Sequence, residues 1–163
     1  MNQAEPDTYR SILEASVVFR GLEAPALDHI FKHGILLDAK KDDLVLFENT
    51  RGGPGLYVVL EGKVEIFLSH DPEKVGFGPS QVYLNTLEPG HCFGEYSLID
   101  GKETSASAKA LKNTRLFFFP RGQFLQLVEN DGRTGKTIYR NLLLYLIERL
   151  RQKDRELDVL IMR

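Results

Sequence analysis

The sequence predicts a mainly β protein with flanking helices, built as an antiparallel β jelly-roll barrel. Residues 35–120 form short runs of β-branched and aromatic residues, separated by Gly, Pro, Asn and Asp. No long helical segments alternate with these runs, which argues against a parallel sheet. The residues before Ile35 and after Pro120 have helical patterns. We therefore expect a single domain over 1–163, with lead-in helices (1–34), a jelly roll (35–120) and C-terminal helices (121–163).

Size and composition fit one globular domain of 163 residues, with 42% apolar and 27% charged residues. The longest purely apolar run, 142–147, is too short to span a bilayer. The N-terminus has no basic region followed by an apolar stretch, and Cys92 is the single cysteine. These features predict a cytoplasmic protein. The net charge of −2 predicts neither nucleic acid nor a membrane as a partner.

The lead-in residues predict two short helices, over 7–19 and 25–33, and Gly34 ends the second. The predicted strands are 44–47, 56–60, 63–68, 81–87 and 114–119. A polar loop, 70–80, separates two of them.

Clean alternation makes 63–68 the clearest strand of the set. Three of its side chains, Val64, Ile66 and Leu68, face one way, and Lys63, Glu65 and Phe67 face the other. This period of two predicts a half-buried strand.

After Pro120 we expect a short helix over 121–129 and a long one over about 133–162. The long helix carries a stripe with alternating spacings of 4 and 3: Tyr139, Leu143, Leu146, Leu150, Lys153, Leu157 and Leu160. This is the pattern of a two-stranded coiled coil with one polar interruption, and it predicts a homodimer through this helix. The alternative is that the stripe packs on the chain's own barrel.

The other residues of this helix divide between the barrel and the solvent. Leu142, Ile147 and Ile161 are available to face the barrel. Basic residues, Arg149 among them, are interleaved with acidic ones, which predicts a mixed solvated face.

The segment from Gly90 reads Gly-His-Cys-Phe-Gly-Glu-Tyr-Ser-Leu-Ile-Asp-Gly-Lys-Glu-Thr-Ser-Ala and resembles a phosphate-binding cassette. The family is the cyclic nucleotide-binding domain, of the type found in catabolite activator proteins and in the regulatory subunit of cAMP-dependent protein kinase. The resemblance implies a cAMP or cGMP site formed by Phe93, Gly94, Glu95, Tyr96, Ser97, Thr104, Ser105 and Ala106. It also implies that Glu95 accepts a hydrogen bond from the ribose 2′-hydroxyl. Because nothing follows Arg163, we expect a stand-alone module without a helix-turn-helix domain.

The residues themselves also favour an anion site. Gly94 lets the backbone come close to a ligand, and the turn over 95–98 can present free N–H groups.

One residue departs from the cassette, since Thr104 stands where the family has the arginine that neutralises the cyclic phosphate. Losing one member of a buried charge pair costs about 2–5 kcal/mol, or roughly 30-fold to several thousand-fold in affinity. Lys102 in the preceding loop and Lys153 on the long helix are candidates to supply the missing charge. Lys153 has an alternative role, which is to set the register of the coiled coil and extend to water. Lys109 is expected to point outward.

We expect a non-enzymatic regulatory module that senses a small ligand in 93–106 and signals through the C-terminal helix. The ligand would be cAMP, cGMP or a different anion, and a separate protein partner would carry the output. The alternative is a degenerate, ligand-free domain that acts as a dimeric protein-interaction module. We expect neither a metal nor a cofactor, because His29 and His33 lie four residues apart without a third ligand and no catalytic motif is present.

Overall fold

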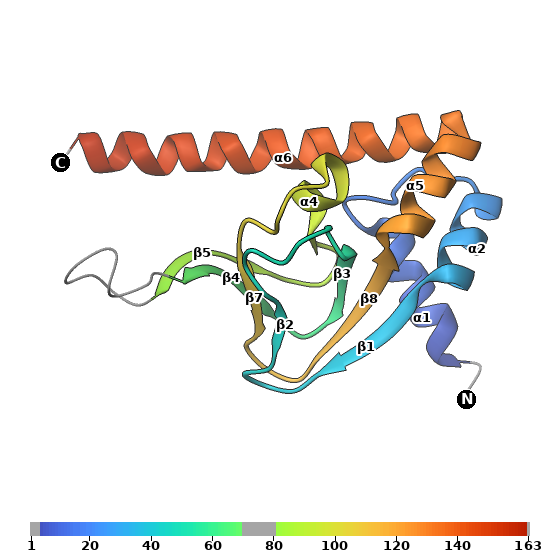
Figure 1. Ribbon diagram of the computed structural model, residues 1–163, viewed down its shortest axis with the longest axis horizontal. Coiled ribbons are helices and arrows are strands. Elements are labelled where there is room, and N and C mark those ends of the chain that lie inside the picture. The colour runs from blue at the N-terminus through green and yellow to red at the C-terminus, as the bar shows by residue number, and fades with distance from the viewer. Residues whose placement is uncertain (1–3, 70–80, 163) are drawn as a thin grey trace.

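The computed structural model describes residues 4–69 and 81–162, and the predicted loop over 70–80 lies outside them. Two four-stranded antiparallel sheets form the body (Figure 1), in the orders β1-β8-β3-β6 and β2-β7-β4-β5. The helices are α1 (Ala4–Ala15), α2 (Ala24–His33), α4 (Glu95–Asp100), α5 (Arg121–Asn130) and α6 (Gly132–Ile161). The strands are β1 (Ile35–Ala39), β2 (Leu44–Leu46), β3 (Gly55–Glu61), β4 (Val64–Ser69), β5 (Gln81–Leu87), β6 (Cys92–Phe93), β7 (Ser107–Ala110) and β8 (Thr114–Pro120). The two sheets do not close into one hydrogen-bonded barrel, so the predicted barrel is an open jelly roll.

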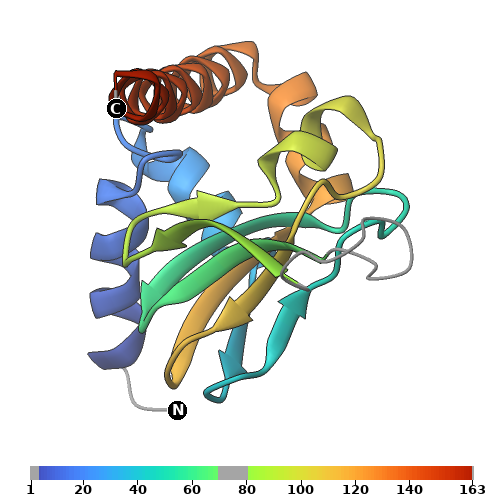
Figure 2. The ribbon, with the colours of Figure 1, turned by 90° about the vertical axis from the view of Figure 1, so that its left-hand side faces the viewer.

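Strand β3 is buried on both faces, and each face belongs to a different hydrophobic core. Tyr57 and Val59 pack toward the second sheet, and the alternating Leu56, Val58 and Leu60 pack toward the helices. Figure 2 views α6 nearly end-on, with α6 above the strands and α1 beside them. The space between the two sheets therefore forms one core, and the helical face of the first sheet forms another.

Gly34 ends α2 as predicted, and the structure gives a steric reason. A Cβ atom there would lie 1.9 Å from the ring of Phe117, which comes from the middle of β8. The chain can therefore enter β1 directly beneath this ring.

Val64 and Ile66 of β4 are buried as predicted, but the burial of the two residues after them differs from the prediction. Phe67 is only 2% exposed, and Leu68, expected to be buried, is only partly so. The facing of Phe67 is still the predicted one, because Phe67 and Glu65 both contact Lys109 of β7, and β4 pairs with β7 without a shift in register. The shift in the pairing with β5 skips Leu84, so the extra residue lies on β5. The ring of Phe67 also lies 5.4 Å beneath the ammonium group of Lys109.

The first half of α6 packs on the body of the protein. Asp131 caps its N-terminus by accepting hydrogen bonds from the backbone N–H groups of Arg133 and Thr134. The Asn141 side chain donates to the carbonyl oxygens of Val18 (3.0 Å) and Arg20 (2.8 Å). These bonds fix the helix to the chain between α1 and α2.

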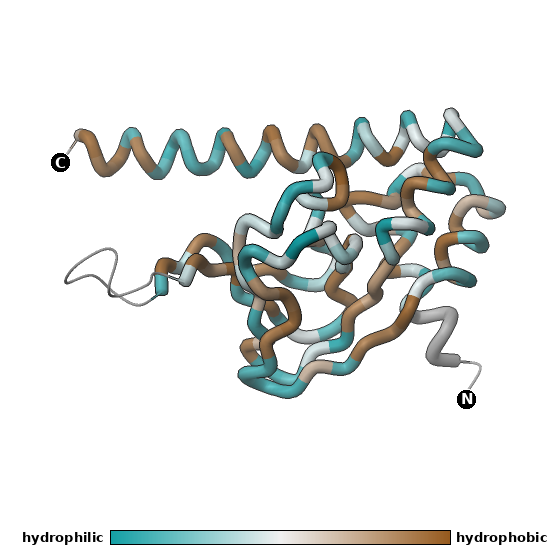
Figure 3. The backbone as a smooth tube through the Cα atoms, viewed as in Figure 1, coloured by the Kyte–Doolittle hydropathy of each residue, from teal (hydrophilic) through white to brown (hydrophobic). Residues whose placement is uncertain are grey.

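The second half of α6 extends past the sheets (Figure 1), and apolar residues continue along it (Figure 3). Leu142 is buried as predicted, but the prediction for Ile147 and Ile161 is wrong, since they are 39% and 81% exposed. The packed stripe runs on the Leu142 side of the helix, and Ile161 lies beyond the sheets. No helix in the described residues is both long and apolar enough to cross a membrane.

Candidate functional site

Gly94 positions the site, because it joins β6 to α4. Its φ of 84° is in the left-handed region, and a Cβ atom there would lie 2.6 Å from the carbonyl oxygen of Gly55 on β3. The close approach that requires glycine is therefore to the backbone of β3. Admission of a ligand by Gly94 stays a prediction.

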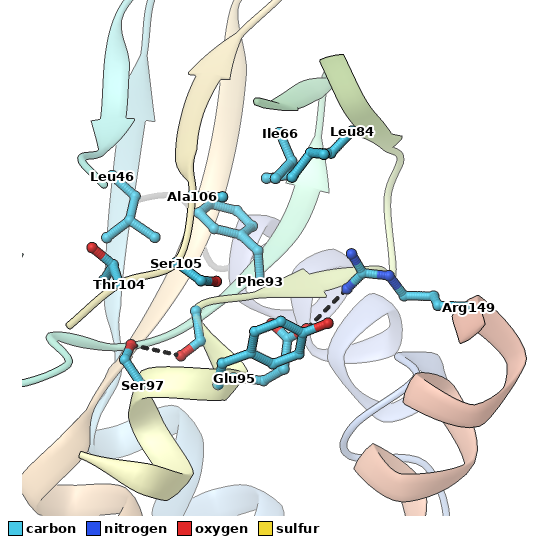
Figure 4. Close-up of a pocket in the computed structure, with 12 residues that line it drawn as sticks. Leu46, Ile66, Leu84, Phe93, Glu95, Ser97, Thr104, Ser105, Ala106 and Arg149 are labelled. Atoms are coloured by element: carbon cyan, nitrogen blue, oxygen red, sulfur yellow. Dashed lines mark hydrogen bonds and ion pairs between the residues drawn. The ribbon is translucent and has the colours of Figure 1, made fainter. Parts of the chain in front are cut away.

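An open cavity lies beside this turn (Figure 4), with about 560 Å³ of empty space when the part open to solvent is included. Its apolar wall is formed by Leu46, Ile66, Leu84, Phe93 and Ala106. The remaining lining residues are Gly94, Glu95, Tyr96, Ser97, Thr104, Ser105 and Arg149.

The structure brings most of the predicted site residues together. Residues 93–97 and 104–106 all line the cavity, whereas Lys102 and Lys153 do not. Lys102 lies in an exposed hollow with Arg51 and Glu103. The Lys153 ammonium group binds the Glu156 carboxylate at 2.7 Å on the same helix, and that of Lys109 is 3.4 Å from Glu65.

Arg149 is the residue that sequence reasoning missed. Its Nη1 donates to Oε1 of Glu95 at 2.9 Å, so α6 contacts the cassette directly. The prediction that Arg149 belongs to a solvated face is wrong, because it continues the packed stripe Ile138, Leu142, Tyr145 and Arg149. The spacing of 4, 3, 4 along that stripe is the sequence pattern that places Arg149 on the packed face.

Burial dominates the electrostatics of Glu95, which is 3% exposed. Burial raises the pKa of the Glu95 carboxyl above its ordinary value, and the charge of Arg149 lowers it by less. The guanidinium also lies 5.4 Å from the ring centre of Tyr145, whose hydroxyl donates to the Cys92 carbonyl oxygen. Within the described lining, Glu95 and Arg149 are the only charged residues, so the wall has no net charge when they are paired as ions.

Thr104 uses its hydroxyl within the protein. Its Oγ1 donates to the Phe47 carbonyl oxygen and accepts from the Thr50 backbone N–H at 2.9 Å. The Thr104 backbone N–H donates to the Thr50 carbonyl oxygen at 3.0 Å. Thr104 therefore joins the cassette to the segment after β2, and its hydroxyl proton is not available to a ligand. In Figure 4 it lies on the opposite side of the cavity from Arg149.

Metal ligands do not gather anywhere in the described part of the chain, where no group of three or more His, Cys, Asp or Glu side chains could hold an ion. The His29 and His33 rings lie 4.2 Å apart, centre to centre, at the end of α2.

Comparison with known proteins finds a family match that includes the cassette residues 93–106. Residues 36–131 match the family model of the cyclic nucleotide-binding domain. A relative named cyclic AMP receptor protein, from Thermus thermophilus, is 40% identical over 108 residues, which is 66% of this chain and 45% of that protein. This chain therefore spans less than half of that relative.

Two solved structures are similar over most of the chain. The catabolite activator protein of Thermus thermophilus has a TM-score of 0.70 at 33% identity, covering 89% of this chain and 63% of that one. A cyclic nucleotide-binding domain from Methylobacillus flagellatus has a TM-score of 0.76 at 24% identity, covering 95% of this chain and 84% of that one. The second likeness shows the fold alone.

Proposed function

Because the chain belongs to the cyclic nucleotide-binding domain family, we propose that it is a non-enzymatic regulatory module that senses a small ligand in the cavity of the cassette. The observation that carries this proposal is the ion pair between Glu95 and Arg149. It joins the cassette to α6 at the cavity wall, so a ligand that hydrogen-bonds either side chain changes how α6 is held. Signalling through α6 is then a population shift between two positions of this helix.

A ligand-free role is the second candidate, and two observations favour it. The Glu95 carboxylate already has a partner in Arg149, and the Thr104 hydroxyl is already bonded to Phe47 and Thr50. The domain would then serve as a dimeric protein-interaction module. Cyclic nucleotide titrations separate the two candidates.

We expect the native chain to bind cAMP and cGMP weakly, and the variant Thr104→Arg to bind at least one of them roughly 30-fold more tightly or better. An arginine there places a cation on the side of the cavity that has none, which is worth about 2 kcal/mol or more. Isothermal titration calorimetry measures both affinities. Thr104→Gln is the control, because it removes the same hydroxyl without adding a charge and should gain nothing.

Two outcomes would contradict the expected weak binding by the native chain or the gain from Thr104→Arg. Micromolar binding by the native chain would show a cyclic nucleotide sensor that does not need the arginine. If Thr104→Arg folds and still binds neither nucleotide, the cavity is not a cyclic nucleotide site and the interaction module gains support.

We also propose a homodimer through the α6 stripe, whose residues are exposed in the single chain except for Leu146, which is partly buried. Leu143 is 60% exposed, Leu150 63% and Leu160 67%. Such exposure along one stripe of a helix is typical of a coiled-coil seam. In this arrangement Lys153 occupies a seam position, where a polar residue sets the register.

Replacing Leu150 by glutamate is expected to convert a dimer into a monomer of 18.5 kDa. The reason is that two buried carboxylates would face each other across the seam. Light scattering after size-exclusion chromatography measures the mass. Leu144→Glu is the matched control, because Leu144 is 42% exposed on the same helix but lies off the stripe. A native chain that is already monomeric at high concentration would contradict the proposal.

A further inference from the structure

We propose that the cavity takes an uncharged ligand of the nucleoside class, in which a vicinal diol is attached to a flat ring system, in preference to a cyclic phosphate. This inference rests on the proposed function, since it names the ligand of the same cavity. Three features of the described lining support it: its charge, the position of its polar groups and the nature of its walls.

The charge of the lining disfavours an anion. Arg149 is its only cation, and its charge is already balanced by the buried Glu95 carboxylate at 2.9 Å. Arg149 also lies across the cavity from Thr104, as Figure 4 shows. An anionic group at the Thr104 side would lose its hydration without gaining a cation. The affinity for a ligand that carries such a group would therefore be lower.

The polar groups at the α6 side suit a diol. A carboxylate accepts hydrogen bonds, and a guanidinium has five N–H donors, of which Nη1 supplies one to Glu95. Acceptor and donor thus lie side by side on one wall. Each hydroxyl of a vicinal diol can both donate and accept, so the two hydroxyls can engage Glu95 and Arg149 together without adding net charge.

The rest of the cavity suits a flat, largely apolar ring system. Leu46, Ile66, Leu84 and Ala106 supply aliphatic surface, and Phe93 supplies an aromatic ring. The Phe93 ring is held by stacking on Tyr57, with centres 4.8 Å apart and planes 6° from parallel. A rigid apolar wall opposite a small polar edge is the usual composition of a small-molecule site.

The chemical difference between the two ligand classes makes a sharp test. A 3′,5′-cyclic phosphate adds one negative charge and uses the 3′ oxygen, which leaves a single ribose hydroxyl. A nucleoside has no charge on its sugar and keeps both the 2′ and 3′ hydroxyls. The same base can therefore be presented with or without the features that this cavity is expected to select.

Calorimetric titration of the full chain with adenosine, guanosine, cAMP and cGMP tests the inference. We expect at least one nucleoside to bind roughly 10-fold or more tightly than its own cyclic phosphate. The 2′-deoxy form of that nucleoside should lose roughly 10-fold, because it lacks half of the diol. The variant Thr104→Arg should reverse the preference, and the native ratio decides alone if that variant does not fold.

The possible failures are distinguishable. Tighter native binding of a cyclic nucleotide than of its nucleoside would overturn this inference and leave the proposed function standing. Equal binding of the nucleoside and its 2′-deoxy form would overturn the role of the diol. If the native chain binds none of the probes but Thr104→Arg binds a cyclic nucleotide, this inference fails and the cavity remains a ligand site. If neither chain binds any probe, the sensing function fails as well.

Discussion

Replacing Arg149 by methionine is expected to lower the free energy of unfolding by about 3 kcal/mol near neutral pH. The Glu95 carboxylate is 3% exposed, and Arg149 is its ion-pair partner at 2.9 Å. Removing one member of a buried pair leaves an uncompensated charge, which typically costs about 3–5 kcal/mol. The lower end applies here, because the Arg149 side chain is 25% exposed and water can replace part of its contribution.

This loss is expected to depend on pH. Burial raises the pKa of Glu95 and Arg149 lowers it, so the pKa rises further when Arg149 is removed. A carboxyl whose pKa is higher in the folded than in the unfolded chain takes up a proton on folding. It destabilises the folded state progressively as pH rises from the unfolded pKa to the folded one. The deficit of Arg149→Met should therefore be smaller at about pH 5 than at about pH 8.

Urea unfolding at equal protein concentration measures both effects, and two variants serve as controls. Adding Glu95→Gln to Arg149→Met should recover much of the lost stability, because the buried group is then neutral. Arg151→Met, which removes an exposed arginine from the same helix, should change stability by less than about 0.5 kcal/mol. An equal deficit at both pH values would show that packing of the Arg149 side chain, and not its charge, is what matters.

The second large effect is expected at Gly94, where alanine should cost about 2–5 kcal/mol. The left-handed φ of 84° accounts for about 1–2 kcal/mol of this, and the new Cβ atom would lie 2.6 Å from the Gly55 carbonyl oxygen. That oxygen belongs to β3, which is buried and paired on both sides, so it cannot move away easily. We also expect the cassette to shift away from β3, which would weaken any ligand affinity.

Gly90 provides the matched control. Its φ is 88°, almost the same as at Gly94, but a Cβ atom there would meet nothing within 4 Å. Alanine at Gly90 should therefore cost only the backbone contribution, about 1–2 kcal/mol. Equal losses for the two variants in thermal or urea unfolding would mean that β3 adjusts freely to the cassette.

The fold could be predicted from the sequence because its signals are local. Short strands, turn residues and the two helical ends each show within a few residues of sequence, and the structure contains them in the predicted order. The burial of Phe67 in β4 was missed for a non-local reason, since its ring lies beneath Lys109 of β7. Barrel closure is equally non-local, because it depends on which edge strands meet.

The candidate site likewise has one side that local sequence predicts and one side that depends on distant residues. The cassette side was predictable, since residues 93–106 are close in sequence and carry a family pattern. The opposite wall was not, because Leu46, Ile66 and Leu84 come from three different strands and Arg149 is 54 residues away from Glu95. The long leucine stripe dominates the pattern of α6 and masks the shorter stripe that ends in Arg149. Likewise, the bonds of Thr104 to Phe47 and Thr50 require the folded chain.

The attachment of α6 by Asn141 has a mechanical consequence. The helix is fixed near its start, touches the cavity at Arg149 and continues past the sheets to Ile161. A tilt of this helix would therefore pivot about Asn141, on the body of the protein. From Asn141 the axis runs for about 12 Å to Arg149 and about 30 Å to Ile161, so a tilt of about 10° about Asn141 would move Arg149 by about 2 Å and the far end by about 5 Å. A movement of Arg149 at the cavity would therefore be more than doubled near Leu160, where two such helices would meet in the proposed dimer.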